Sequence, residues 1–515
     1  MSEATAARPL SGIPLVLGTI ALSLATFMNV LDTSIANVSL PAIAGNLGAS
    51  PNQGTWIITS FGVANAISVP LTGWLAQRVG AVRLFTASVL LFVLTSWMCG
   101  FAPSLELLIV FRILQGLVAG PMIPLSQALL LSTYPKERSA LALSMWSMTT
   151  LVAPVAGPLL GGWITDNVSW PWIFYINIPV GLLAAAVAWA IYRHRETPTR
   201  KLPIDGVGLG LLVLWVGALQ VMLDKGKELD WFHSPAIVAS ALVAAIGFVV
   251  FVIWELTEEH PIVDLRLFKG RNFSFGVATL SLAWLVYFGN VVLLPLWLQQ
   301  YLGYTATAAG FALAPVGVLA VLLSPYVGRI LPNVDPRWIS TTSFAVFAAV
   351  LLLRAQYTPQ VDQWSIMVPT FIQGAAVACL FTPLVSVIIS GLDPSKIPSA
   401  TGLSNFVRIT AGAFGTSITT TLWDNRATLH HAHLAESITQ ASPEAAQGYA
   451  TLGTLGLDPQ QVAAQLNRII DQQAFTRAAD DIFLGSALLF AALIAVVWLT
   501  RPARVSGPVD TGGAH

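Results

Sequence analysis

The chain has 515 residues, of which 55% are apolar and only 10% are charged, and its 25 Lys and Arg residues balance its 25 Asp and Glu residues. Soluble domains carry about 25% charged residues, so the composition excludes an ordinary cytosolic enzyme and a disordered chain. The zero net charge offers no basic surface to a polyanion, which excludes a nucleic-acid-binding protein. We therefore expect an all-α protein that crosses a membrane many times.

Apolar runs that are long enough to cross a membrane recur along the whole chain. A spanning helix needs about 20 mainly apolar residues, and a helix satisfies its own backbone groups in lipid. Fourteen runs meet this requirement, at residues 14–38, 54–75, 84–102, 104–126, 140–164, 173–192, 205–223, 235–255, 273–298, 306–327, 338–353, 364–390, 402–422 and 481–500. Of the Lys and Arg residues, 17 lie in the loops on the side of the two termini and 6, including Arg354, in the opposite loops. Both termini are therefore expected in the cytoplasm.

Two charged side chains lie inside the predicted spans of the N-terminal half. Asp32 and Arg112 are each about eight residues from the outer end of their runs, which places both roughly 12 Å below the outer surface and allows them to pair. A charge inside the membrane costs about 2.5–3.5 kcal/mol or more, so it is normally functional or paired. We interpret Asp32 as the carrier of a coupled proton, with Arg112 setting its proton affinity. A purely structural ion pair is the alternative.

The loop between the second and third runs combines glycine with arginine. Gly73 and Gly80 suit a sharp turn, and Arg78 and Arg83 can bind the C-terminal ends of neighbouring helices. A generic positively charged cytoplasmic loop is the alternative interpretation.

The fifth run contains the segment APVAGPLLGG. Gly157 and Gly161 allow two helices to approach closely, and Pro154 and Pro158 remove backbone donors and bend the helix. We expect this segment, which ends at Gly162, to form a tight sliding contact between two halves of the protein. Plain helix packing is the alternative.

Polar and aromatic side chains inside the other runs are candidates for the lining of a substrate cavity. The candidates are Phe27, Gln115, Trp146, Tyr287, Asn290, Gln373, Asn405 and Arg408. For each aromatic residue, packing against lipid or another helix is the alternative. The long stem of Arg408 could instead carry its charge to the membrane interface.

The segment 424–480 is long, polar and expected outside the membrane. Its pattern predicts two amphipathic helices and a docking surface for an external partner. We interpret His430, His431 and His433 as part of a solvated face, with a metal site as the alternative. The two cysteines have no metal-ligand spacing, and every histidine lies outside the apolar runs. We therefore expect no metal and no cofactor.

The two halves of the chain repeat one another at an offset of 255–258 residues. The glycine-arginine loop at Gly73 matches one at Gly328, and LQG before PL in the fourth run matches IQG before PL in the twelfth. Duplicated halves are typical of transporters. Asp32 maps to Asn290, so the charge chemistry is expected in the N-terminal half. The expected organisation is a cytoplasmic N-tail at 1–13, a six-helix bundle at 14–192, two inserted helices at 205–255, a second six-helix bundle at 273–500 and a cytoplasmic C-tail at 501–515.

Four segments resemble motifs of the major facilitator superfamily, namely LDTSIANVSLP, GWLAQRVGAVR, FRILQGLVAG and APVAGPLLGG. Over essentially its whole length the chain resembles the 14-helix drug:proton antiporters of that superfamily, and among them the EmrB-type inner-membrane subunits of tripartite multidrug pumps. One departure is Gln77, where the superfamily usually carries an Asp.

The resemblance implies a major facilitator fold with 14 transmembrane helices, and a secondary active transporter rather than an enzyme. Such a protein is a proton-coupled exporter of hydrophobic toxic compounds in the bacterial inner membrane, with a periplasmic adaptor protein and an outer-membrane channel as partners. It also implies that Asp32 and Arg112 couple protons and that Gly157 and Pro158 belong to the antiporter motif. An exporter dedicated to one endogenous metabolite is the alternative. An ATP-driven pump is disfavoured, because the sequence has no GxxxxGK[ST] loop.

Overall fold

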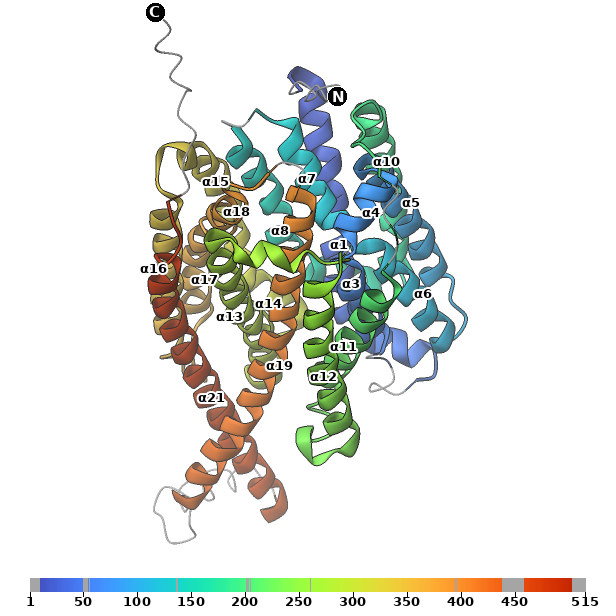
Figure 1. The fold of residues 1–515 in the computed structure, drawn as a ribbon. Helices are drawn as coiled ribbons and strands as arrows, with labels where there is room; N and C mark the ends of the chain where they lie inside the picture. Colours follow the sequence, from blue (N-terminus) through green and yellow to red (C-terminus); the bar gives the residue numbers. More distant parts are fainter. Residues whose placement is uncertain are drawn as a thin grey trace, which may run out of the picture.

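The structure is a computed structural model that describes residues 10–49, 54, 56–135, 138–200, 203, 205–259, 261–393, 396–437 and 458–502. Every regular element in these ranges is a helix, as expected (Figure 1). The α-helices are α1 (Gly12–Asn46), α3 (Trp56–Ser68), α4 (Thr72–Val79), α5 (Ala81–Gly100), α6 (Leu105–Ala119), α7 (Met122–Thr133), α8 (Ser139–Asn167), α9 (Trp172–Tyr175), α10 (Asn177–Tyr192), α11 (Gly206–Lys225), α12 (Pro235–Thr257), α13 (Arg271–Tyr301), α14 (Ala306–Leu313), α15 (Pro315–Ile330), α16 (Pro336–Arg354), α17 (Gln363–Ala378), α18 (Phe381–Ile389), α19 (Ile397–Ser437) and α21 (Pro459–Val497).

Each expected apolar run falls on one helix or on two successive helices. In the described part of the chain, eleven helices are long and apolar enough to cross a membrane, and α3 with α4, bent by 60°, gives a twelfth. Two more runs, 140–164 and 402–422, fall on α8 and α19, which are continuous helices of 29 and 41 residues. The count of fourteen spans therefore stays a prediction.

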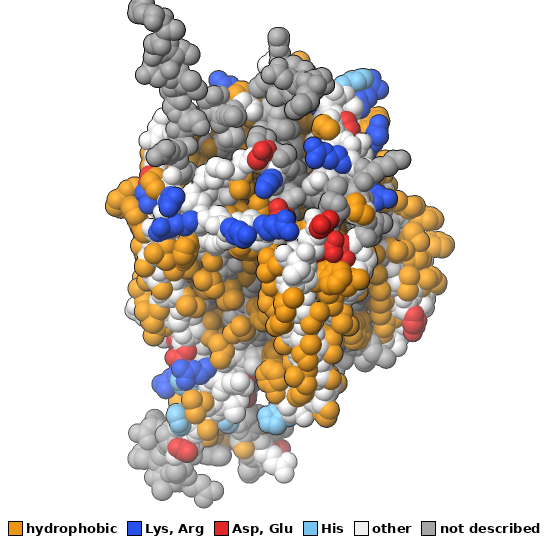
Figure 2. Space-filling view, in the orientation of Figure 1, with side chains coloured by type: hydrophobic (Ala, Val, Ile, Leu, Met, Phe, Trp, Pro, Cys, Tyr) orange, Lys and Arg blue, Asp and Glu red, His pale blue; other side chains and the backbone are white. Residues whose placement is uncertain are grey.

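The surface has the polarity of a membrane protein. Figure 2 shows a broad apolar belt, with most of the visible Lys and Arg side chains gathered toward the end of the molecule that carries both termini. Large apolar side chains such as Leu94, Ile246 and Leu322 are half or more exposed within spanning helices. Exposure on this scale would destabilise the chain in water and is matched to lipid.

The helices pack mainly within two groups along the chain. Helices α1 to α10 contact chiefly one another, and so do α13 to α21, while α11 and α12 pack together and touch α3 and α19. The most extensive contacts are α1 with α8 in the first group and α13 with α19 in the second. These two pairs occupy matching places in the sequence repeat.

Glycine makes closely matched helix contacts in the two groups. A Cβ atom on Gly157 of α8 would collide with Ser34 of α1, and one on Gly415 of α19 would collide with Leu285 of α13. The two glycines are 258 residues apart. The partner helix therefore approaches each glycine so closely, through the Ser34 side chain at Gly157 and the Leu285 backbone at Gly415, that no larger residue fits without movement.

A second matched pair joins the two groups. A Cβ atom on Gly73 would lie 2.9 Å from the Cα atom of Ser399, and one on Gly328 would lie 2.6 Å from the Cα atom of Leu141. Both contacts lie toward the end of the molecule that carries the termini (Figure 1). The two groups are thus in close contact at this end.

Candidate functional site

The structure brings Asp32 of α1 and Arg112 of α6 into direct contact. The Nη1 atom of Arg112 donates to Oδ2 of Asp32 over 2.6 Å, and the two side chains are 1% and 0% exposed. The equal depth of the two residues in their apolar runs predicts this contact, and the structure confirms the geometry.

Two neutral side chains, Asn177 and Gln115, complete the hydrogen bonding of Asp32. Its Oδ1 atom accepts from Asn177 over 2.9 Å and from Gln115 over 3.3 Å. Gln115 also accepts from Arg112 over 2.7 Å and donates to Ser96 over 2.7 Å. The network joins α1, α5, α6 and α10, and it satisfies a charged carboxylate with three donors. Gln115, a candidate for the cavity lining, is part of this charged network.

Apolar side chains seal the network on several sides. The guanidinium of Arg112 lies 4.2 Å from the ring centre of Phe61 and 5.5 Å from that of Phe174. Phe27 packs against the same apolar cluster, which includes Leu31 and Ile57. In this conformation the Asp32 side chain is only 1% exposed, so its carboxylate is buried.

The second group contains a related network that the sequence analysis did not anticipate. Arg354 is expected in an outer loop, but this is wrong, because it is the last residue of α16 and is 2% exposed. Its Nη2 atom donates to Thr370 over 2.9 Å and to Gln373 over 2.7 Å. At the repeat offset of 258, Gln373 matches Gln115, and Arg354 matches Ser96.

In the first group the buried arginine, Arg112, lies on the fourth run of the repeat, whereas in the second group Arg354 lies on the third. A glutamine at the matching position is its partner in both groups. Asn290, which stands where the first group has Asp32, donates to Ser486 over 3.0 Å rather than to a charged group. The second group thus holds a buried arginine without a carboxylate partner at the matching place. The repeat offset could have predicted that Arg354 lies in a helix, because it maps Arg354 onto Ser96 inside the third apolar run.

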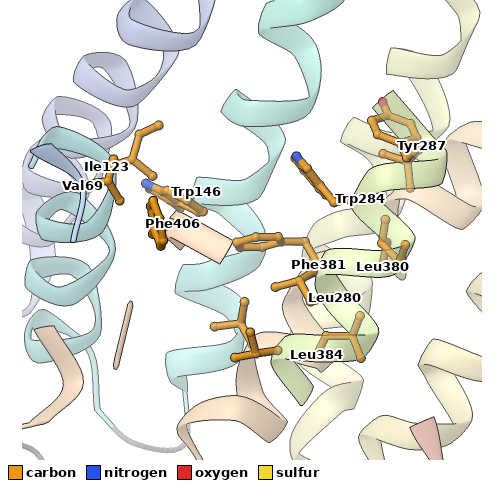
Figure 3. Close-up of a cluster of buried hydrophobic side chains, with 14 of the residues drawn as sticks. Val69, Ile123, Trp146, Leu280, Trp284, Tyr287, Leu380, Phe381, Leu384 and Phe406 are labelled. Carbon is orange, nitrogen blue, oxygen red and sulfur yellow. The ribbon is translucent and has the colours of Figure 1, made fainter. Parts of the chain in front are cut away.

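A cluster of aromatic side chains lies where the two groups meet. Figure 3 shows Phe381 of α18 between Trp146 of α8 and Trp284 of α13. The ring centres are 5.4 Å apart for Trp146 and Phe381 and 6.2 Å apart for Trp284 and Phe381. Tyr287 packs on Trp284 at 5.7 Å. Two of the expected cavity aromatics, Trp146 and Tyr287, therefore belong to one cluster.

Arg408 of α19 joins this aromatic cluster. It is 3% exposed, and its guanidinium lies 4.2 Å from the ring centre of Trp284. The alternative in which its stem reaches the interface is therefore wrong. The Oδ1 atom of Asn405 accepts from Arg408 over 2.8 Å, and Asn405 donates to Gln127 of α7 over 3.1 Å. Arg408 and Asn405 thus lie at the contact between the two groups, as residues of a central site would.

The loop after the second apolar run forms a sharp turn at Gly80, between α4 and α5. Gly80 has a φ of 99°, which favours glycine, and Arg78 packs over the ring of Trp74 at 5.3 Å. The backbone N–H groups of Val82 and Arg83 donate to the carboxylate of Glu196 over 3.0 and 2.9 Å. This acid, which lies beyond α10 in the chain, caps the positive end of the α5 dipole.

In the second group, an acidic residue also caps the helix that follows the matching loop. Asp335 caps the N-terminus of α16 and pairs with Arg337 over 2.6 Å. The hydrogen bonds from the Arg337 side chain hold the pKa of Asp335 below its usual range. Both loops therefore place a carboxylate at the start of a helix, although Gln77 stands where the superfamily motif has its acid.

In the segment APVAGPLLGG of α8, some glycines lie against a neighbouring helix and one faces open space. Gly157 and Gly161 face α1 closely, whereas a Cβ atom on Gly162 would meet no atom within 4 Å. The helix runs through the positions of Pro154 and Pro158, whose side chains lie outside the described part of the structure. Gly157 and Gly161 contact a helix of their own group, so the segment packs inside the first group at these positions.

The outer segment is helical at both ends. The C-terminal part of α19 and the N-terminal part of α21 extend from the rest of the molecule at the end opposite the termini (Figure 1). His430 contacts Asp481 over 2.8 Å and His431 contacts Asp471 over 3.4 Å. Among the described residues no group of three or more His, Cys, Asp or Glu side chains could hold a metal ion. Residues 438–457 of the expected docking surface lie outside the described part.

Comparisons with known proteins agree with this architecture. A model of the Major Facilitator Superfamily matches residues 22–416. The Multidrug export protein EmrB of Escherichia coli K12 is 52% identical over 509 residues, which cover 99% of either chain. The Fatty acid resistance protein FarB of Neisseria gonorrhoeae is 50% identical over 507 residues, which cover 98% of this chain and 99% of that one. The crystal structure of the human organic anion transporter MFSD10 (TETRAN) has a TM-score of 0.58 at 12% identity, covering 94% of this chain and 100% of that one, so the fold is shared.

Proposed function

Because this chain belongs to the major facilitator superfamily, and within it to the EmrB-type multidrug exporters, we propose that it moves hydrophobic compounds outward across the bacterial inner membrane in exchange for protons. It is a transporter rather than an enzyme. Both termini lie in the cytoplasm in this proposal, which rests on the gathering of Lys and Arg at the terminal end (Figure 2).

The buried pair of Asp32 and Arg112 is the observation that carries the proton coupling. A proton and the Arg112 guanidinium compete for the same carboxylate, because a protonated Asp32 no longer attracts the arginine. Among the described residues, Arg112 would then keep hydrogen bonds to Gln115 and to the backbone oxygen of Ile57, besides its contacts with the rings of Phe61 and Phe174. Loading the proton therefore weakens the tie between α1 and α6 and favours a conformation in which the pair is apart.

The two groups of helices, 14–192 and 273–500, rock against one another in this proposal. The close glycine contacts at Gly73 and Gly328 hold the terminal end shut in the present conformation. Separation of these contacts opens a central site to the cytoplasm and inner leaflet. Closure returns the site to the outer side, where Asp32 exchanges its proton.

The outer segment 424–480 delivers the cargo onward in this proposal. Its helical ends in α19 and α21 stand clear of the apolar belt (Figure 1), so a soluble partner could reach them. We assign the partner as a periplasmic adaptor that leads to an outer-membrane channel, as the resemblance of the sequence implies.

Transport into everted membrane vesicles tests the coupling. An acid vesicle interior should drive uptake of a fluorescent hydrophobic dye by the wild-type protein, and a protonophore should abolish it. Asp32→Asn keeps the shape of the side chain but cannot carry the proton as a carboxylate does. We expect it to reduce the proton-driven rate by about a hundredfold, the scale of a lost proton-transfer group, at equal amounts of protein in the membrane.

Ser39→Ala is the matched control for this experiment. Ser39 also lies on α1 and is buried, and it forms a 2.7 Å hydrogen bond with Thr165 that carries no charge. Its loss should change the rate by less than about threefold, in line with one neutral hydrogen bond. Proton-driven uptake by Asp32→Asn at the wild-type rate would remove Asp32 from the mechanism.

A narrower cargo range is the second candidate. The relative from Neisseria gonorrhoeae is named for fatty acid resistance, which favours a specialised exporter of amphipathic compounds. A panel of dyes, antibiotics and fatty acids separates the two candidates. Uptake of many unrelated compounds supports the multidrug exporter, and uptake of one class alone supports the specialised exporter.

A further inference from the structure

Two acidic side chains meet at one end of the helix pair α11 and α12, away from the network of Asp32. Asp205 is the N-cap of α11, and Glu255 lies in the last turn of α12. A Cβ atom on Gly208 would lie 2.2 Å from Oδ2 of Asp205 and 2.6 Å from Oε1 of Glu255, so both oxygens lie against the same point of α11. The loop between α11 and α12 is at the end opposite the termini in Figure 1, so the two acids lie at the end of the pair nearer the termini.

Three of the four carboxylate oxygens of this pair have donors, and the fourth has none. Oδ1 of Asp205 accepts from the backbone N–H of Gly208 over 2.8 Å, and Oδ2 accepts from Nε1 of Trp254 over 2.9 Å. Oε2 of Glu255 accepts from the backbone N–H of Val263 over 3.0 Å. Glu255 is 0% exposed, and its Oε1 atom has no hydrogen-bond partner. An ionised oxygen that is buried without a donor is costly.

The charges around Glu255 favour a neutral carboxyl group over a carboxylate. None of the ion pairs among the described residues includes Glu255 or Asp205, and Glu258 at the end of α12 adds a third acid nearby. The Nη2 atom of Arg266 donates to the backbone oxygen of Glu258 over 3.2 Å. Two carboxylates that share a buried site do not both stay ionised.

The other charged or titratable residues of the elements packed most closely on α12 are Asp224 and Lys225 of α11, Asp230 and His233 at η2 (Trp231–His233), and Asp264 and Lys269 at η3 (Leu265–Lys269).

We propose that Asp205 and Glu255 form a proton-binding site, in which Glu255 carries a proton on Oε1 and donates it to Oδ2 of Asp205. A protonated carboxyl group is a donor as well as an acceptor. One proton therefore gives the unpartnered oxygen a hydrogen bond and removes the repulsion between the two acids. Oδ2 then accepts two hydrogen bonds, from Trp254 and from Glu255, which a carboxylate oxygen can do.

This proton joins three segments of the chain. Asp205 caps α11, and Glu255 holds the backbone of Val263 in the segment that leads through η3 to α13, the first helix of the second group. Loss of the proton places two negative charges against each other and loosens this connection. The site thus makes the attachment of α11 and α12 to the second group depend on the pH on the side of the termini. It is separate from Asp32, whose proton crosses the membrane in the proposed function.

Infrared titration of the purified full-length protein tests for the proton. The C=O stretch of a neutral carboxyl group is separate from that of a carboxylate. The wild-type spectrum minus that of Glu255→Gln should therefore contain one neutral-carboxyl band at neutral pH, which disappears as the pH rises. Asp205→Asn keeps a good N-cap residue but places an amide donor beside Glu255. It should move the disappearance of this band to lower pH.

Thermal unfolding gives the second readout. A carboxyl group that keeps its proton in the folded state stabilises the fold at low pH, and this contribution is lost as the pH rises. In Glu255→Gln the side-chain amide replaces the shared proton as the donor. This variant should unfold near the wild-type temperature at mildly acidic pH, and about 2 °C or more above it at mildly alkaline pH.

Glu259→Gln is the matched control. Glu259 is an exposed acid just beyond the end of α12, and its substitution makes the same chemical change four residues from Glu255. The neutral-carboxyl band and the pH dependence of unfolding should both stay as in the wild-type protein.

The proposal is overturned if the difference spectrum of Glu255→Gln contains no neutral-carboxyl band at neutral pH, which is the result expected of a bound cation or of two ionised side chains. A band that disappears at the same pH in Asp205→Asn would also overturn it, because the proton is then not shared. These measurements involve no cargo and no transport. Failure of the proton site therefore leaves the proposed exporter intact, and a protein that transports no compound leaves the proton site intact.

Discussion

Asp32 and Arg112 stabilise the fold through each other's charge, because the pair is buried and neither has a second ion-pair partner among the described residues. Arg112→Gln leaves a buried carboxylate without its counter-charge, which should cost about 3–5 kcal/mol of stability. The double variant Asp32→Asn with Arg112→Gln removes both charges and should cost less than the sum of the two single changes. Thermal unfolding of the detergent-solubilised protein measures all three variants.

An exposed pair supplies the control for this cycle. Lys227 and Asp424 form a 2.7 Å ion pair whose side chains are 46% and 40% exposed, and exposed pairs contribute about 0–1 kcal/mol. Lys227→Gln should therefore shift the unfolding temperature little. Additive effects in the buried cycle would show that Asp32 and Arg112 do not interact as a charged pair.

At this scale the sequence predicts charges better than their neutral partners. The cost of a charge in lipid singles out Asp32 and Arg112, and their equal depth predicts the contact. Asn177 and Ser96 carry no such cost, so nothing in the pattern distinguishes them from other polar residues of apolar runs. The prediction for Arg354 is wrong because a charge at the edge of an apolar run is compatible with both a loop and a helix end.

Close helix packing by small residues is the main feature at the scale of the elements. Gly157 and Gly162 belong to the same motif, yet a Cβ atom collides with α1 at the first and meets open space at the second. Gly157→Ala should destabilise the protein by about 1–3 kcal/mol through overpacking. Gly162→Ala should be neutral or slightly stabilising, because alanine favours a helix.

Thermal unfolding again gives the comparison between the two glycine variants. Equal unfolding temperatures for Gly157→Ala and Gly162→Ala would contradict the close contact between α1 and α8. If the contact also slides during transport, Gly157→Ala should slow dye uptake in vesicles more than its loss of protein amount explains.

The internal repeat shows why much of the element scale is predictable. An offset of 255–258 residues relates the crowded glycines Gly157 and Gly415, which the structure places in matching helix pairs. Helix breaks are harder to predict, because hydropathy does not change where α3 ends and α4 begins after Pro70. A bend there depends on the lost backbone donor of the proline and on packing from neighbouring helices.

At the scale of the whole molecule, the proposed transport cycle depends on how the elements are placed relative to one another. The charged network lies within the first group, the aromatic cluster with Arg408 lies where the groups meet, and the glycine contacts of Gly73 and Gly328 close the terminal end. In the proposed cycle, protonation of Asp32 would act on the packing of α1, whose extensive contact with α8 connects it to the second group through α15. The proposed coupling therefore follows a continuous path of packed helices.

Proton movement across reconstituted membranes tests this central claim most directly. Proteoliposomes that contain a pH-sensitive dye receive a gradient of a transported compound and no pH gradient. The wild-type protein should move protons in the direction opposite to the compound, and Asp32→Asn should move none while remaining inserted and folded. Proton movement by Asp32→Asn at the wild-type rate, or transport of the compound by the wild-type protein with no proton movement, would contradict the account.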